Sequence, residues 1–138
     1  MSRQFTLGKN ERLKSRKQIE QLFSSGKSFN LSPFRIYYLF SKPNTYDSKL
    51  TTQFGVGVSG KNFKKAVDRN RIKRLTREAY RLQKLGLQQK LKEKNLPLNI
   101  FFIYSDKELP DFNLIKGKLA VALKKLETII DENISSHS

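Results

Sequence analysis

The residues with the most distinctive chemistry are the basic side chains between Lys61 and Arg81. This stretch holds nine Lys and Arg residues against two Asp and Glu. On a helix of about 3.6 residues per turn, Arg69, Lys73 and Arg77 follow one another on one side. Like charges one turn apart repel, whereas a helix stabilised by its own surface pairs acids with bases. The pattern therefore indicates a surface that binds a polyanion, such as a chain of phosphates.

The same predicted helix, from about residue 62 to residue 85, also has an apolar stripe and a polar border. The stripe consists of Ile72, Leu75, Ala79 and Leu82, and the basic row is bordered by Asn70, Arg74 and Arg81. We expect the stripe to face the core and the basic row to face outward. The competing interpretation is a charged face that serves only solubility, as most charge runs on helices do. The scarcity of acidic partners disfavours it.

Groups that could cleave a bond are sparse in this chain. A protein nuclease normally needs clustered carboxylates for metal ions or a histidine placed as a general base. The one histidine is His137, and the carboxylates considered, Asp47, Asp68, Glu78 and Asp106, are scattered. There is no cysteine, which excludes disulfides, thiolate chemistry and cysteine-based zinc sites. We therefore expect no catalytic residues, and the sequence does not identify any side chain as a metal ligand.

The net charge of +16 over 138 residues is unevenly distributed. Residues 1–35 hold eight basic and two acidic side chains, residues 36–105 hold fifteen and four, and residues 106–138 hold five and six. This excess predicts an anionic partner for the first two thirds of the chain. A membrane is a weaker candidate, because the basic helix lacks a broad apolar face. The N-terminus has no signal-peptide core and the longest apolar run is short, so we expect a cytoplasmic protein.

A first helix and two strands are expected to precede the basic helix. The first helix begins at a capping box, Ser15 to Gln18, and ends at Gly26. A strand at residues 34–40 places Phe34, Ile36, Tyr38 and Phe40 on one face and Arg35, Tyr37 and Leu39 on the other. A loop at 41–52 leads to a second strand at 54–59. Its glycines, Gly55 and Gly57, leave room for another backbone to approach.

After the basic helix, which is expected to end at Gly86, a third strand and a last helix are predicted. The strand covers about residues 98–105, and the helix follows Pro110 with an apolar stripe of Ile115, Leu119, Leu123, Leu126 and Ile130. The element order αββαβα indicates an α+β fold with helices over one side of a small sheet. We expect one domain over residues 1–138, with flexible ends at 1–8 and 133–138.

The basic helix also carries a specific motif. The run Ala66-Val67-Asp68-Arg69-Asn70-Arg71-Ile72-Lys73-Arg74-Leu75, continued by Arg77-Glu78-Ala79, resembles the signature helix of the bacterial ribonuclease P protein family. Other segments match in the same order, namely Arg12-Leu13-Lys14, Phe34 and Tyr37, and Phe54-Gly55-Val56-Gly57-Val58-Ser59. The resemblance extends from about residue 9 to residue 130. Two positions depart from the family pattern: Ile19 stands where an aromatic is common, and Gly60 where a lysine is common.

The resemblance implies a fold similar to the second domain of ribosomal protein S5, with a mixed sheet and a left-handed βαβ crossover through the basic helix. It also implies a subunit that assists a catalytic RNA, which uses Mg²⁺ to hydrolyse the 5′ leader from precursor tRNA. The implied partners are that RNA and the precursor tRNA, with no obligate protein partner. The chain alone is not expected to be catalytic.

By position, the resemblance assigns two RNA-binding surfaces. The signature helix would contact the catalytic RNA through Arg69, Asn70, Arg71, Lys73, Arg74 and Arg77. A cleft between the first helix and the open sheet face would hold the single-stranded leader through Phe23, Tyr37, Arg35 and Ile19. Ile19 cannot stack as a ring does, and both Phe23 and Tyr37 could instead serve the core. Further basic side chains expected to contact RNA are Arg12, Lys14, Lys61, Lys64, Lys65 and Arg81.

Two other functions fit parts of the sequence. A structural RNA-binding protein, such as a ribosomal protein, has a similar composition, but the matches in three separate segments favour the ribonuclease P family. A DNA-binding regulator could read the major groove with the basic helix. The sequence shows no convincing partner helix at helix-turn-helix spacing before it.

Overall fold

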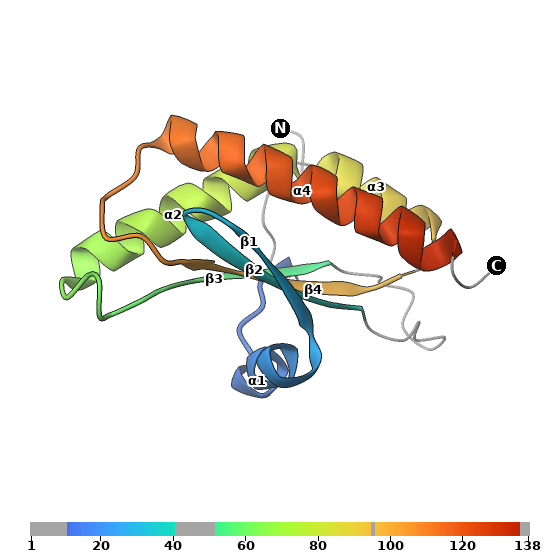
Figure 1. Ribbon diagram of the computed structural model, residues 1–138, viewed down its shortest axis with the longest axis horizontal. Coiled ribbons are helices and arrows are strands. Elements are labelled where there is room, and N and C mark those ends of the chain that lie inside the picture. Colours follow the sequence, from blue (N-terminus) through green and yellow to red (C-terminus); the bar gives the residue numbers. More distant parts are fainter. Residues whose placement is uncertain (1–10, 41–51, 95, 136–138) are drawn as a thin grey trace.

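The structure is a computed structural model that describes residues 11–40, 52–94 and 96–135 (Figure 1). In chain order the elements are α1 (Arg16–Ser25), β1 (Lys27–Leu31), β2 (Phe34–Phe40), β3 (Gln53–Val58), α2 (Ala66–Gln83), α3 (Leu85–Glu93), β4 (Leu98–Tyr104) and α4 (Phe112–Ser135). The α+β class is confirmed. The order is αβββααβα, so the expected order αββαβα lacks one strand and one helix. The expected flexible end at 1–8 and most of the loop at 41–52 lie outside the described residues, and the backbone is helical up to Ser135.

The four strands form one mixed sheet in the order β1-β2-β4-β3. β2 pairs antiparallel with both β1 and β4, whereas β3 pairs parallel with β4. Across the middle of the sheet, Tyr37 lies opposite Phe101, and Phe101 lies opposite Gly55. The parallel pair requires a crossover, and α2 and α3 supply it. The left-handed sense of this crossover remains a prediction from the family resemblance.

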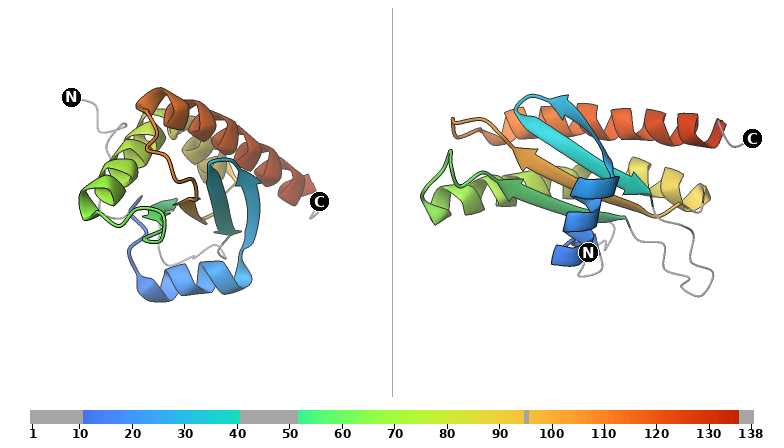
Figure 2. Two further views of the ribbon diagram at one scale, coloured as in Figure 1. Left: turned by 60° about the vertical axis from the view of Figure 1, so that its left-hand side comes forward. Right: turned by 60° about the horizontal axis from the view of Figure 1, so that its bottom comes forward.

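The helices of the described residues lie on both faces of the sheet. α2, α3 and α4 cover one face, and α1 lies against the opposite face, where it contacts β2 and β4 (Figures 1 and 2). The expectation that the helices lie over one side is therefore wrong for α1. The main core lies between the sheet and the α2–α4 layer, and its largest fully buried members include Tyr80, Tyr104, Phe34, Phe54 and Phe102.

Several local predictions are confirmed. Ser15 caps α1 by accepting a hydrogen bond from the Gln18 amide at 3.4 Å, and Gly26 follows the last turn with its amide bonded to the Leu22 carbonyl. In β2, Phe34, Ile36 and Tyr38 are buried and Arg35 is exposed, as the alternation predicts. All five residues of the predicted α4 stripe are buried. These features depend on local periodicity and capping chemistry, which a sequence displays directly.

The strand β1 was not predicted. Its sequence, Lys-Ser-Phe-Asn-Leu, has few β-branched or aromatic residues. It forms because β2 offers a free edge, against which Lys27 to Leu31 pair in a hairpin across the cis Ser32–Pro33 bond. Phe29 and Leu31 then pack against the core. The strand is thus selected by tertiary pairing rather than by propensity.

The predicted helix at 62–85 is wrong at both ends. Residues 59–65 form a loop, in which the Asn62 side chain donates to the backbone carbonyls of Ser105 and Asp106 at 3.2 and 3.4 Å. Gly86 does not end a helix but lies inside α3, where it lacks the positive φ of a glycine cap. A second helix can follow at once because Leu87 and Leu91 provide it with buried side chains.

The apolar stripe predicted for α2 is confirmed for Ile72, Leu75 and Ala79 and wrong at Leu82, and the buried side extends instead to Thr76 and Tyr80. The buried side consists of Ile72, Thr76, Ala79 and Tyr80, while Leu82 is 38% exposed. The Tyr80 ring stacks on Phe54 of β3 at 4.0 Å with an interplanar angle of 3°, which fixes this side toward the sheet. Thr76 tolerates burial because its hydroxyl donates to the Ile72 carbonyl at 2.7 Å.

Candidate nucleic-acid interface

Three residues of the signature motif lie on the side of α2 that faces solvent. Asn70, Arg71 and Arg74 are exposed and, with Val67 and Asp68, line a shallow hollow of about 570 Å³. Three of the six predicted helix contacts therefore lie together around one open depression. Its two guanidinium groups can each bind a phosphate through two parallel hydrogen bonds.

Arg69 differs from its neighbours because it turns back toward the protein. Its Nη1 atom donates to the backbone carbonyls of Phe63 at 2.7 Å and Lys64 at 2.9 Å. These bonds hold the loop before α2 against the first turns of the helix. The prediction that Arg69 contacts RNA is not tested by this geometry, but two of its five N–H donors are already engaged within the protein.

Lys73 and Arg77 follow each other by one turn along one flank of α2. Lys73 is half-buried and Arg77 is exposed. Partial desolvation, followed by the nearby Arg12 guanidinium, lowers the pKa of Arg77. Arg12, which is far away in the sequence, thus lies near Arg77. The sequence predicts Arg12 only as an additional RNA contact and does not indicate that it lies near Arg77.

The loop before α2 adds more positive charge at the start of that helix. Lys61, Lys64 and Lys65 are exposed, and Lys65 occupies the cap position without a side-chain capping bond. Cations at a helix N-terminus are unfavourable, because the helix dipole is already positive there. A bound phosphate would relieve that repulsion.

The two remaining basic positions are less distinctive. Lys14 is exposed after the N-terminal segment. Arg81 is half-buried and forms an ion pair with Glu78 at 3.4 Å, one turn away on the same helix. Such a pair is the arrangement expected of an ordinary solvated face. Among the predicted RNA contacts, Arg81 therefore best fits the interpretation that the charges serve only solubility.

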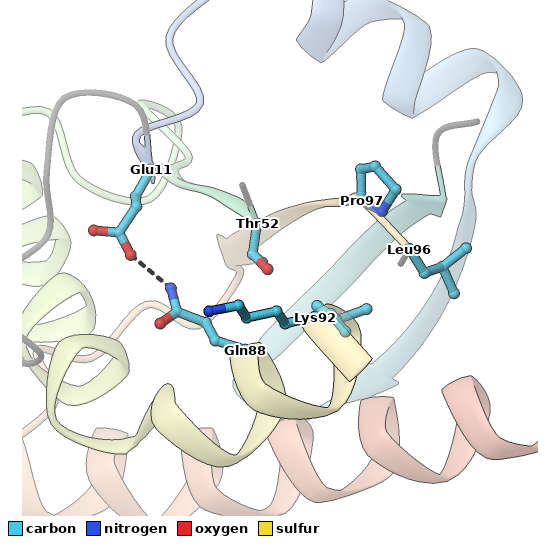
Figure 3. A pocket seen from close by; sticks show the side chains of 7 residues that line it. Glu11, Thr52, Gln88, Lys92, Leu96 and Pro97 are labelled. Atoms are coloured by element: carbon cyan, nitrogen blue, oxygen red, sulfur yellow. Dashed lines mark hydrogen bonds between the residues drawn. The ribbon is translucent and has the colours of Figure 1, made fainter. Parts of the chain in front are cut away.

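The N-terminal segment that carries Arg12 is fixed to the body of the protein. The Leu13 amide donates to the Phe54 carbonyl at 2.9 Å, and Glu11 accepts from Lys84 at 2.7 Å and from Gln88 at 2.6 Å. Lys84 is 2% exposed and Glu11 is 19% exposed, so the ammonium end of this ion pair is buried. Figure 3 shows the Glu11–Gln88 bond at the edge of a pocket of about 250 Å³ whose wall also includes Thr52, Leu96 and Pro97.

A second candidate surface lies between α1 and the face of the sheet that α1 contacts. The Phe23 ring of α1 lies 4.8 Å from Tyr37 and 5.4 Å from Phe101, and the Arg35 guanidinium lies 5.5 Å from the centre of the Tyr37 ring. Phe23 is 43% exposed. The structure gives Phe23 both ring contacts, as a core residue needs, and an exposed surface, as a ligand contact needs. Ile19 is half-buried on the same helix.

The glycines of β3 are already covered by a ring. A Cβ added to Gly55 would lie 2.7 Å from Phe101 Cδ2 and 3.1 Å from the Leu13 carbonyl, and one added to Gly57 would lie 3.0 Å from Phe101 Cε1. The expectation that another backbone approaches this strand is met at Gly55 by Leu13. The Phe101 ring of β4 fills the space above both glycines.

Phe101 was not predicted as a site residue. The alternation of β4 was a usable signal, since the burial of Ile100, Phe102 and Tyr104 turns Phe101 and Ile103 to the opposite face. The position of Phe101 beside Tyr37 could not be predicted from the sequence, because the strand order decides which strand lies next to β2. The aromatic cluster, defined here as Phe23, Tyr37 and Phe101, is thus a product of the fold.

A metal-binding group and a membrane-spanning helix are both absent from the described residues. None of their His, Asp and Glu side chains form a group of three or more that could hold a metal ion. None of the described helices is both long enough and apolar enough to cross a membrane.

Comparison with known proteins identifies the family. The family Ribonuclease P matches residues 7–127. The ribonuclease P protein component of Porphyromonas gingivalis is 39% identical over 124 residues, which cover 88% of this chain and 87% of that protein. That of Chlorobium phaeobacteroides is 31% identical over 122 residues, which cover 83% and 84%. The structure of the RNase P protein from Thermotoga maritima matches with a TM-score of 0.64 and 28% identity, covering 83% of this chain and 96% of that one. The chain therefore belongs to the ribonuclease P protein family.

Proposed function

We propose that this chain acts as one RNA-binding domain that joins a catalytic ribonuclease P RNA to the precursor tRNA whose 5′ leader the RNA removes. Family membership supports the assignment. The observation that carries it is the outer face of α2, where Asn70, Arg71 and Arg74 surround an open hollow. A cationic hollow of this kind suits the phosphates of a folded RNA.

The protein's contribution would be electrostatic. Bringing a precursor tRNA to a catalytic RNA places two polyanions side by side, and their repulsion opposes assembly. The cations of α2, with Arg12 on its flank and three lysines at its N-terminus, would neutralise phosphates at that junction and release their counterions. Backbone amides at the start of α2 could also point at a phosphate.

The aromatic cluster supports a second part of the proposal, that the cleft beside α1 holds the unpaired leader. Stacking of bases on aromatic rings contributes about 1–3 kcal/mol per base and tolerates many sequences. Arg35, above the Tyr37 ring, can bind a leader phosphate while its neighbour stacks a base. A subunit that serves many different leaders needs this kind of recognition.

The proposal places Mg²⁺ and the chemical step with the RNA–protein holoenzyme, in the cytoplasm. We assign no protein ligand to the metal, as no recognisable metal-binding motif occurs in the sequence. The role left to the protein is to hold the two RNA molecules in register for hydrolysis.

Reconstitution tests the proposal. The chain is added to a bacterial ribonuclease P RNA, and removal of the leader from a labelled precursor tRNA is followed as Mg²⁺ is lowered. We expect the protein to restore cleavage at Mg²⁺ concentrations at which the RNA alone is inactive. Absence of stimulation under these conditions would overturn the assignment.

The leader cleft is tested with Tyr37→Ala. Because the ring would contact only the unpaired leader, the variant holoenzyme should bind precursor tRNA about fivefold or more weakly, from the lower end of stacking energies. Its affinity for mature tRNA, which has no leader, should stay unchanged. Equal losses for the two ligands would argue against the cleft.

A further inference from the structure

The pocket shown in Figure 3 is separate from the hollow on α2 and from the aromatic cluster. It has a volume of about 250 Å³ and lies between the N-terminal segment, the residue before β3, and α3 with the two residues before β4. Its lining consists of Glu11, Thr52, Gln88, Leu91, Lys92, Leu96 and Pro97. Pockets for drug-sized ligands measure about 300–1,000 Å³, so this one suits a smaller group, such as a single nucleobase.

The side chain of Thr52 indicates that the pocket is built for a ligand. Thr52 is 5% exposed, and Figure 3 shows its side chain directed toward the same space as Lys92. Its hydroxyl has no hydrogen-bond partner among the described residues. The other buried threonine, Thr76, does have one, the Ile72 carbonyl at 2.7 Å. Buried polar groups are nearly always hydrogen-bonded, so a group inside the pocket should satisfy the Thr52 hydroxyl.

The apolar part of the lining favours an organic ligand over water. Leu91 is 3% exposed, and Leu96 and Pro97 are half-buried beside it in the pocket wall. Water could satisfy the Thr52 hydroxyl but would leave these three side chains hydrated. A flat ring that displaces the water gains the free energy of burying their apolar surface.

The polar part of the lining defines the edge that such a ring must present. The Gln88 amide donates one hydrogen to Glu11 at 2.6 Å and has a second one. Together with the Thr52 hydroxyl it can donate to carbonyl oxygens, which pyrimidine bases carry. Lys92 is exposed, and its ammonium group has no ion-pair partner among the described residues. A phosphate attached to the ligand can therefore bind Lys92 at the mouth of the pocket.

We propose that this pocket is a nucleotide-binding site, which takes one unpaired pyrimidine base inside and its phosphate on Lys92. The inference rests on the proposed function and deepens it by one further RNA contact. Glu11 lines the pocket, and the next residue, Arg12, lies near Arg77 of α2. A strand bound along α2 can therefore reach the pocket across the N-terminal segment. A free mononucleotide has the same chemistry, so the experiment must distinguish these two sources.

NMR titration of the isotope-labelled full chain with 5′-UMP tests the site. Ribose 5-phosphate, which lacks the base, is the reference for phosphate binding to the many cations of the surface. We expect 5′-UMP to shift the backbone amide signals of Thr52, Gln88 and Leu91. At the same concentration ribose 5-phosphate should leave them nearly unchanged. Equal shifts with both probes, or no shift with 5′-UMP, would overturn the inference.

Three variants identify the contacts. Thr52→Val removes the hydroxyl but keeps the shape of the side chain, so the free energy of unfolding in urea should be retained. Its affinity for 5′-UMP should fall about fivefold, as expected for the loss of one hydrogen bond. Lys92→Gln should weaken 5′-UMP by a similar factor. Lys94→Gln is the matched control, since it makes the same change at an exposed lysine outside the pocket lining, and it should bind 5′-UMP like wild type.

Binding of the same variants to a bacterial ribonuclease P RNA, with and without precursor tRNA, distinguishes the two sources of the nucleotide. If the base belongs to RNA, Thr52→Val should weaken RNA binding about fivefold, and Lys92→Gln should reduce the slope of log affinity against log salt by about one unit. If the variants lose affinity for 5′-UMP alone, the ligand is a free nucleotide. Wild-type affinity of Thr52→Val for both would overturn the inference. The proposed function would still stand in that case if the wild-type chain restores leader removal at low Mg²⁺.

Discussion

At the scale of single residues, the arginines of α2 serve different purposes although they belong to one motif. Arg69 bonds the backbone of the preceding loop at 2.7 and 2.9 Å, whereas Arg74 is exposed beside the open hollow. Arg69 is a positioning residue for the loop that carries three lysines. Under the proposed function, Arg74 would meet a phosphate directly.

This difference predicts a split between stability and binding. Arg69→Ala removes two hydrogen bonds from a charged donor and should lower the free energy of unfolding by about 1–2 kcal/mol. Arg74→Ala should change it by less than about 0.5 kcal/mol but reduce the slope of log affinity against log salt by about one unit. Urea unfolding and RNA binding at several salt concentrations measure both quantities. A larger stability loss in Arg74→Ala than in Arg69→Ala would contradict these roles.

The raised pKa of Tyr104 predicts that the stability of the protein changes at alkaline pH. Burial, followed by the charges of Asp106 and Glu108, raises the pKa of Tyr104 from 10.0 to about 12. Below pH 10, Tyr104 keeps its phenolic proton in both the folded and the unfolded chain. Between pH 10 and 12 the unfolded chain loses it while the folded chain retains it, so stability falls as pH rises, by about 1 kcal/mol from pH 10 to pH 11.

The measurement compares urea unfolding of wild type and Tyr104→Phe at pH 9 and pH 11. The variant lacks the titrating phenol, so its stability should fall less over this interval. Other groups, including buried Tyr80, titrate in both proteins and cancel in the difference. Parallel losses in the two proteins would show that Tyr104 does not titrate as described.

At the scale of elements, the packing of β4 on β3 depends on glycine at one position. Gly55→Ala would place a Cβ 2.7 Å from the Phe101 ring and 3.1 Å from the Leu13 carbonyl. We expect the free energy of unfolding to drop by about 1–3 kcal/mol, because the ring and the N-terminal segment must both shift. Gly60→Ala is the matched control, since nothing lies within 4 Å of its added Cβ. Equal stability of the two variants would mean that the contact relaxes without cost.

At the scale of the whole molecule, the ion pair between Glu11 and Lys84 joins segments that are 73 residues apart in the sequence. Lys84 is 2% exposed and Glu11 is 19% exposed, so the two partners are not equivalent. Glu11→Gln removes the carboxylate charge that faces the buried ammonium group of Lys84 and should cost about 3 kcal/mol of unfolding free energy. Lys84→Met leaves the more accessible carboxylate and should cost less. Thermal or urea unfolding gives the order, and the reverse order would contradict this account.

The same ion pair bears on the proposed RNA binding, because Glu11 adjoins Arg12, which lies close enough to Arg77 to lower the pKa of Arg77. Anchoring the N-terminal segment therefore extends the basic surface of α2 by one guanidinium. The extension depends on contacts that no local pattern in the sequence describes.

The amino-acid sequence by itself determined the class of fold, three of the strands, the first and last helices and the basic surface of α2. These follow from capping residues, from periods of 2.0 and 3.6, and from charge, all of which act over a few neighbouring residues. The motif around Arg69, Asn70 and Arg71 determined the family for the same reason, since it is contiguous.

Only the tertiary structure decided which side chains meet across the chain. It extended the buried side of α2 to Tyr80, because that ring stacks on Phe54, and it turned Arg69 back onto the Phe63 carbonyl. It also added β1, by pairing with a free edge, and brought Phe101 opposite Tyr37 and Gly55, by placing β4 between β2 and β3. Strand order and long-range packing energies select these arrangements, and neither leaves a periodic trace in the sequence.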